Sequence, residues 1–167
     1  MTYRILLIGL DQIQFEKEDD EHIQTVSDIS DAPTLYDYDI IIIFSVGLKY
    51  YILAKDKKEE FEMFFLMGGV LLEFPVGYIP SEIFPIELPE VVSKEGECII
   101  PTDKHPFSSI FKNIEFEWCW HLKRPYIEEL TIGKNLPGCP ISYEIKLDSG
   151  AKIFFLPVSW ARVQTSA

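Results

Sequence analysis

The stretch of sequence that decides the fold begins Tyr38-Asp39-Ile40-Ile41-Ile42-Ile43-Phe44 and ends Val70-Leu71-Leu72-Glu73-Phe74-Pro75-Val76-Gly77. The first run holds four consecutive β-branched residues, which oppose helix formation and predict a buried strand over residues 39–44. The second run predicts another buried strand over residues 70–74. A helix between the two would complete a strand–helix–strand unit, which is typical of a parallel sheet covered by helices.

The segment between these strands has the pattern of an amphipathic helix. Its phenylalanines at i, i+3 and i+4 form one apolar stripe: Phe61, Phe64 and Phe65. Asp56 and Glu59 have the spacing of a capping box, which places the start of the helix near Asp56. Gly68 can end the helix in the left-handed conformation, and Gly69 allows a tight turn into the next strand. We therefore expect the stripe to lie on the sheet as core, not as a cofactor site.

Further strands are predicted on either side of this unit. The apolar run over residues 4–9 predicts a central parallel strand buried on both faces, and residues 25–29 predict a short edge strand. Four prolines between residues 75 and 89 predict an irregular loop, and residues 114–121 alternate as a strand does. Residues 141–147 and 152–157 predict an antiparallel hairpin turning at Asp148-Ser149-Gly150. The predicted fold class is α/β, with a mostly parallel central sheet flanked by helices and a C-terminal antiparallel hairpin.

Composition bounds the class of protein. The length of 167 residues predicts one domain over residues 1–167, with 47% hydrophobic residues to fill its core. With 15 basic and 27 acidic residues the net charge is -12, which disfavours nucleic acid and anionic membranes. An acidic cytoplasmic protein is expected, and a basic partner protein is the sharper alternative.

The terminal segments and the cysteines bear on location. No apolar run is long enough to span a bilayer, and no signal-peptide segment follows the first residues. Three cysteines without a C-x-x-C pair argue against a zinc ribbon and for a reducing compartment. Residues 158–167 show no helix stop. We therefore expect that they form a tail, or that the chain is the N-terminal part of a longer protein.

The order of these segments resembles the class I glutamine-amidotransferase-like fold, in particular its divergent relatives near the trehalose-utilisation-type proteins. The features that carry the likeness are residues 38–43, the helix with residues 67–72, His105-Pro106-Phe107 with Ile110-Phe111, and residues 150–157. The resemblance implies a flavodoxin-like α/β domain. It also implies a Gly-x-Cys-x-Gly elbow after the second strand, where a strained turn exposes a thiolate. Here Pro75 stands at the Cys position, and no acid follows two residues after His121, so glutaminase activity is not expected.

Residues at the carboxyl ends of the predicted strands are candidates for a ligand pocket, because α/β sheets bind ligands in a crevice at that edge. With two histidines added as acid or base, the candidates are Gly9, Asp11, Ser45, Gly47, Pro75, Gly77, His105 and His121. No catalytic residue, metal site or cofactor is predicted, since no Gly-rich phosphate loop follows a strand and Ser45 stands where a phosphoacceptor domain needs Asp. Cys119 and His121 share a face of their predicted strand, but Trp118 and Trp120 favour local packing over an activated pair.

Aromatic residues in predicted surface segments are candidates for an interface, where such residues are enriched. They are Tyr50, Tyr51, Tyr78 and Phe84. The first functional hypothesis is a non-catalytic binding domain with a regulatory or scaffolding role, acting through a protein partner or self-association. The second is a hydrolase acting on a small metabolite or carbohydrate in the crevice, with His105, His121 or Glu73 as acid or base. The third is a structural oligomer-former, which would show a large apolar surface patch.

Overall fold

The computed structural model describes residues 2–9, 22–46, 56–76, 91–95, 100–101, 105–106, 118–122, 131–134 and 140–156. The chain divides into two compact units. Unit 1 comprises Met1–Glu87 and Lys146–Ile153, and unit 2 comprises Leu88–Ile145 and Phe154–Ala167. The prediction of one domain over residues 1–167 stays a prediction.

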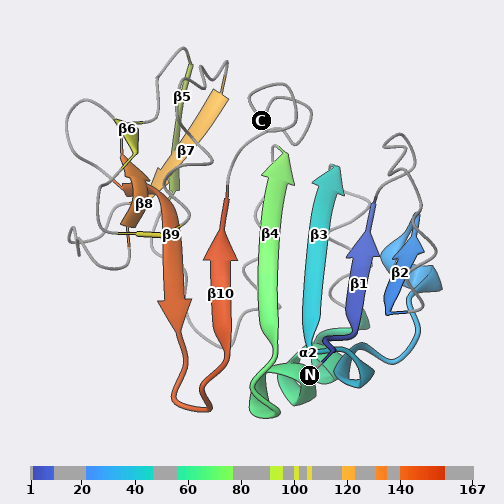
Figure 1. Ribbon diagram of the computed structural model, residues 1–167. Helices are drawn as coiled ribbons and strands as arrows, with labels where there is room; N and C mark the ends of the chain where they lie inside the picture. The colour runs from blue at the N-terminus through green and yellow to red at the C-terminus, as the bar shows by residue number, and fades with distance from the viewer. Residues whose placement is uncertain are drawn as a thin grey trace. The chain divides into compact units, whose positions relative to one another are not determined.

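Unit 1 is built on a mostly parallel sheet (Figure 1). Its strands are β1 (Ile5–Ile8), β2 (Ile23–Val26), β3 (Ile40–Val46) and β4 (Val70–Val76). They lie in the order β2-β1-β3-β4, and each neighbouring pair is parallel. The order continues with the start of β10 (Lys152–Phe155) and the end of β9 (Pro140–Lys146). The predicted α/β class with a mostly parallel sheet is confirmed. The described residues contain one α-helix, so the predicted flanking by several helices is not shown among them.

The two strands of the central unit are longer than the sequence predicts. The strand expected over residues 39–44 is β3, which continues to Val46, and the strand expected over residues 70–74 is β4, which continues to Val76. Register explains the extension, because Ser45 still pairs with Pro75 and Val46 with Val76. The fixed φ of proline is compatible with extended backbone. The prediction that an irregular loop begins at Pro75 is therefore wrong by two residues.

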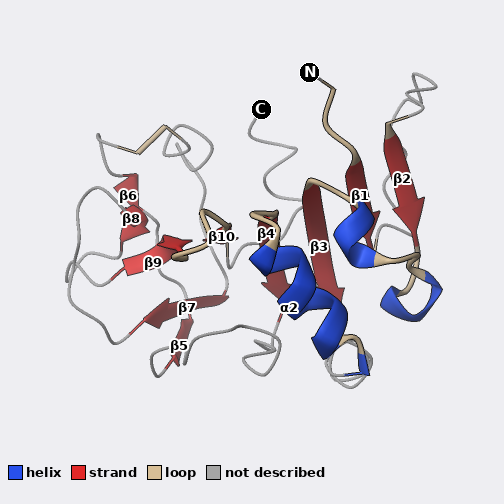
Figure 2. Cartoon of the chain, turned by 90° about the horizontal axis from the view of Figure 1, so that it is seen from below, coloured by secondary structure: helices blue, strands red, loops and turns tan. Residues whose placement is uncertain are grey.

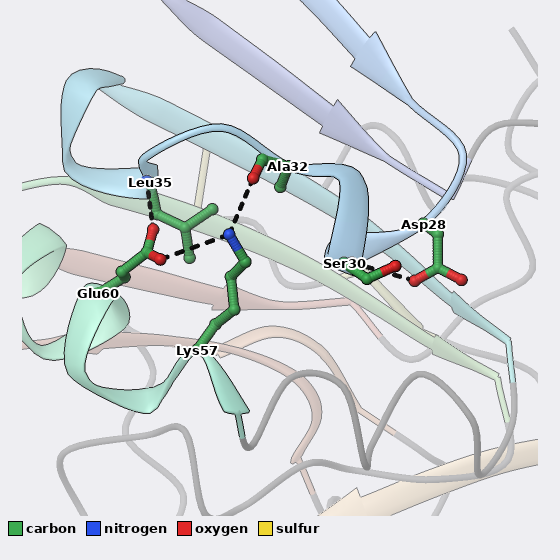
Figure 3. Close-up of polar contacts among 6 residues, drawn as sticks. All are labelled: Asp28, Ser30, Ala32, Leu35, Lys57 and Glu60. Carbon is green, nitrogen blue, oxygen red and sulfur yellow. Dashed lines mark hydrogen bonds and ion pairs between the residues drawn. The ribbon is translucent and has the colours of Figure 1, made fainter.

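The predicted edge strand is present but begins earlier in the chain. It is β2, at the end of the strand order, and it stops at Val26. Ile29 lies instead in a 3-10 turn, η1 (Ile29–Asp31), where the side chain of Asp28 accepts a hydrogen bond of 3.1 Å from the N–H of Ser30 (Figure 3). A capping side chain of this kind starts a turn and ends the preceding extended segment.

The predicted helix is α2 (Lys58–Leu66), which lies beside β3 and β4 in Figure 2. Its three stripe residues are each at most 2% exposed, so the stripe is core as expected: Phe61, Phe64 and Phe65. The capping box is wrong, because the N-cap is Lys57 and makes no side-chain cap bond. At the other end the N–H of Gly68 (φ 83°) bonds to Phe65 O, and the N–H of Gly69 bonds to Phe64 O. The predicted helix end is confirmed.

Lys57 and Glu60 fasten the start of α2 to the segment before β3 (Figure 3). The ammonium of Lys57 donates to the carbonyl of Ala32 at 2.8 Å and lies 3.4 Å from Glu60 Oε1. Glu60 Oε2 accepts the N–H of Leu35 at 2.9 Å. Leu35 opens the 3-10 turn η2 (Leu35–Asp37), which α2 contacts. A charged pair that uses distant backbone groups thus replaces the predicted local cap.

The C-terminal hairpin turn also belongs to unit 1. The N–H of Gly150 bonds to Leu147 O at 3.0 Å, and the N–H of Leu147 bonds to Ala151 O at 2.9 Å. Ser149 Oγ donates to the carbonyl of Phe65 at 2.6 Å, which fastens the turn to the end of α2. The predicted turn between β9 and β10 is confirmed.

Unit 2 is antiparallel in its described strands. β5 (Val91–Glu95) pairs with β7 (Trp118–Leu122), which confirms the second half of the alternating strand predicted over residues 114–121. β8 (Thr131–Lys134) lies between β9 and β6 (Ile100–Pro101) and pairs antiparallel with both. Across the described parts of both units, no helix is long and apolar enough to cross a membrane.

The two faces of the parallel sheet in unit 1 differ in burial. Alternation along the strands puts six side chains on one face, each at most 1% exposed: Leu6, Ile8, Ile41, Ile43, Leu71 and Glu73. The opposite face is buried at Leu7, Phe44 and Phe74, which are each at most 7% exposed. Its other side chains are half-buried: Ile5, Ile40, Ile42, Val70 and Leu72. Parallel sheets normally have both faces covered.

Candidate functional site

The structure brings three of the predicted pocket residues to one edge of the sheet in unit 1. Gly9 follows β1, while Ser45 and Pro75 lie opposite each other near the ends of β3 and β4. Because these strands are parallel, their carboxyl ends meet at the same edge. Gly9, Ser45 and Pro75 therefore lie at the edge of the sheet where the crevice is predicted.

Gly9 has a structural reason to be glycine. Its N–H donates to Val26 O at 2.9 Å, and its φ of 92° lies in the left-handed region that side chains disfavour. A Cβ at this position would overlap the carbonyl oxygen of Phe44 in the neighbouring strand. Close approach of β1 to β3 therefore explains this glycine without a ligand.

The end of β4 lacks the geometry of a nucleophile elbow. An elbow needs a sharp turn at the residue that follows the strand. Here residue 75 is proline, and the strand continues through it to Val76 in register with β3. Two residues earlier, Glu73 is fully buried, and on the other face the rings of Phe44 and Phe74 stack at 5.1 Å. The carboxylate of Glu73 is therefore out of reach of a substrate in solution.

A second polar feature lies in unit 2, where His105 Nε2 and Glu144 Oε2 are 2.8 Å apart. Their side chains are 1% and 9% exposed, and the imidazole meets the ring of Phe154 edge-on at 6.1 Å. A carboxylate beside an imidazole is the arrangement that orients a general base. Burial of both groups instead favours a structural tie, since a general base must reach its substrate's proton.

Sequence reasoning named His105 and missed Glu144. The two residues are 39 positions apart, so neither spacing nor alternation pairs them. The alternating pattern of residues 141–147 places Glu144 on one face of its strand, and only the tertiary fold makes that face buried. No local signal could have found Glu144, because it alternates with Ser142 and Lys146 as residues on a solvent-facing side of a strand do.

The other predicted site residues fall into two groups. His121 lies in β7 of unit 2, where its backbone pairs with Val92, as that of Cys119 pairs with Lys94. The rest lie outside the described residues: Asp11, Gly47, Tyr50, Tyr51, Gly77, Tyr78 and Phe84. Within the described ranges no three His, Cys, Asp or Glu side chains gather closely enough to hold a metal ion.

Sequence reasoning also missed an apolar surface on α2. Met63, Leu66 and Met67 are 45%, 71% and 67% exposed, on the side of the helix opposite its buried phenylalanines. The signal was present, because these residues recur at i, i+3 and i+4 just as the buried stripe does. Two interleaved apolar stripes make a short helix apolar on two sides, and only one side can face the sheet.

Comparison with known proteins finds no match for this chain. No family model, no curated protein and no solved structure matches it. The resemblance to the amidotransferase-like fold therefore stays a prediction that rests on the quoted segments alone.

Proposed function

We propose that this chain is a non-catalytic binding domain with a regulatory or scaffolding role, and that its finer fold class is flavodoxin-like and similar to the class I amidotransferases. The observation that carries the proposal is the end of β4. The resembled family places its nucleophile there, whereas Pro75 has no nucleophilic atom and extends the strand in register with Ser45. A domain that keeps the sheet and lacks the elbow is suited to binding.

Exposed apolar side chains on α2 support a protein as the bound partner. Leu66 and Met67 of this helix are 71% and 67% exposed. Contiguous exposed apolar side chains mark protein interaction sites more often than single ones do. Either a protein partner or a second copy of the chain would cover such surface.

The hydrolase of a small metabolite or carbohydrate is the second candidate. The 2.8 Å contact of His105 with Glu144 favours it, since this pair could hold an imidazole ready to accept a proton. Burial of both side chains disfavours it. The two candidates differ in what the protein should carry when it is isolated gently.

Native mass spectrometry of the protein captured from its own source extract tests the proposal. It reports oligomeric mass, bound proteins and retained small molecules together. A stoichiometric protein complex or a defined oligomer is expected. A monomer that carries only a small molecule would contradict the binding-domain proposal. Turnover of that molecule, lost in the His105→Phe variant, would then establish the hydrolase.

A further inference from the structure

The solvent side of α2 exposes three neighbouring apolar side chains. We define the α2 surface as Met63, Leu66 and Met67, which are 45%, 71% and 67% exposed. They stand at i, i+3 and i+4, so they lie next to one another along one side of the helix. Long, unbranched methionines adapt to differently shaped apolar partners, which makes them common at binding surfaces.

Acidic side chains border the α2 surface. Glu59 and Glu62 are exposed and precede Met63 and Leu66 by one helical turn. The lysines of this helix balance them only in part. Lys57 is 17% exposed in its side chain and donates to a backbone carbonyl, while Lys58 lies 3.9 Å from Glu62 in an exposed pair.

The hairpin turn at residues 148–150 lies beside the C-terminal end of the α2 surface. Ser149 Oγ donates to the carbonyl of Phe65, so exposed Asp148 belongs to the segment beside the last turn of α2. Exposed Lys146 and Lys152 flank the same turn. The acidic border is therefore strongest along the first two turns of the helix.

Charge favours a basic partner over a second copy of the chain as the occupant of the α2 surface. Each copy of the chain carries a net charge of -12, so a second copy is repelled. Three side chains are also too few to supply the roughly 800 Å² that each partner buries in a stable dimer. A single segment with an apolar side and basic flanks satisfies both the stripe and its border.

We propose that the α2 surface binds a basic amphipathic helical segment of a partner protein. The inference rests on the proposed binding function and names its surface and the chemistry of its partner. Apolar side chains at i and i+3 or i+4 of the segment contact Met63, Leu66 and Met67, while its lysines or arginines lie near Glu59 and Glu62.

Fluorescence anisotropy with a defined probe tests this surface. The probe is a labelled peptide of about 14 residues, four helical turns, with Leu on one side and Lys on the other. The Leu66→Gln/Met67→Gln protein should bind it at least about tenfold more weakly than the unchanged protein. The matched control is Tyr3→Ser, which removes an apolar side chain that is 57% exposed elsewhere in unit 1 and should leave binding unchanged.

The same peptide with Glu in place of Lys separates charge from apolar contact. It should bind at least about tenfold more weakly, and added salt should weaken the Lys peptide. Equal binding of both peptides, equal binding by the variant, or no binding by the unchanged protein would overturn the proposal. Because the substituted residues are exposed, thermal unfolding should stay the same, and Met63→Gln provides a second variant if it does not.

Failure of this surface is distinguishable from failure of the binding function. A partner captured equally by the unchanged protein and by the variant overturns the α2 surface and leaves the binding domain intact. Capture of no partner and no oligomer by either protein overturns both. A dimer seen by sedimentation and lost in the variant would identify a second copy as the occupant and overturn the basic partner.

Discussion

Replacement of Gly9 by alanine tests the close approach of β1 and β3 at the edge of the sheet. Gly9 has a φ of 92°, and a Cβ there would come within 3.0 Å of the Phe44 carbonyl oxygen and 3.3 Å of its carbonyl carbon. Gly150 provides a matched control. It has a similar φ of 86°, but no atom lies within 4 Å of its Cβ position.

The two substitutions share one destabilising effect and differ in another. Left-handed backbone costs an alanine about 1–2 kcal/mol at either position. At Gly9 the overlap is with backbone in a paired strand, which cannot turn away as a side chain can, and overpacking of this kind adds about 1–3 kcal/mol. Gly9→Ala should therefore lower the free energy of unfolding by about 2–5 kcal/mol, and Gly150→Ala by about 1–2 kcal/mol.

Urea unfolding followed by far-UV circular dichroism measures this difference. At about 2–4 °C per kcal/mol for a chain of this size, Gly9→Ala should also melt about 2–12 °C below Gly150→Ala. Equal stability of the two variants would refute the overlap. The glycine would then have to be explained by a ligand that approaches the backbone at this edge.

Further predictions concern polar ties between distant parts of the chain. Lys57→Met should lower the free energy of unfolding by about 1–2 kcal/mol, because it removes a charged donor from Ala32 O. Lys58→Met, which breaks only an exposed ion pair, should change it by less than about 0.5 kcal/mol. Chemical denaturation of both variants measures the difference. A double-mutant cycle with His105→Phe and Glu144→Leu should show a coupling of about 1–3 kcal/mol, and additive effects would mean that the 2.8 Å contact contributes nothing.

Local sequence pattern predicted the elements of unit 1 well, because their causes are local. The isoleucines of residues 40–43 resist helix formation wherever the chain places them, and Gly68 and Gly150 supply positive φ where a helix ends and a hairpin turns. The stripe of Phe61, Phe64 and Phe65 needed only helical spacing to become core.

What the sequence failed to predict depends on tertiary contacts. Asp56 has the spacing of a capping residue, yet the N-cap is Lys57. The ammonium of Lys57 donates a hydrogen bond to the carbonyl of Ala32, which lies 25 residues earlier in the chain. The contact of buried Glu144 with His105 joins residues 39 positions apart, so no local pattern contains it. The spacing of Met63, Leu66 and Met67 predicts a second apolar stripe on α2. A stripe that faces solvent and a stripe that faces the core have the same spacing, so the sequence does not show which one is buried. Only the position of the sheet decides between them.

The return of Lys146–Ile153 to unit 1 has a consequence for biosynthesis. Residues 88–145 must leave the ribosome before the turn that fastens to Phe65 and the strand beside β4 can arrive. At about 5–20 residues per second, that interval is roughly 3–12 s. Until then the nascent chain carries a strand without one of its two neighbours, and such an edge invites pairing with other chains. Slow synthesis of the middle of the chain should therefore raise aggregation of the newly made protein.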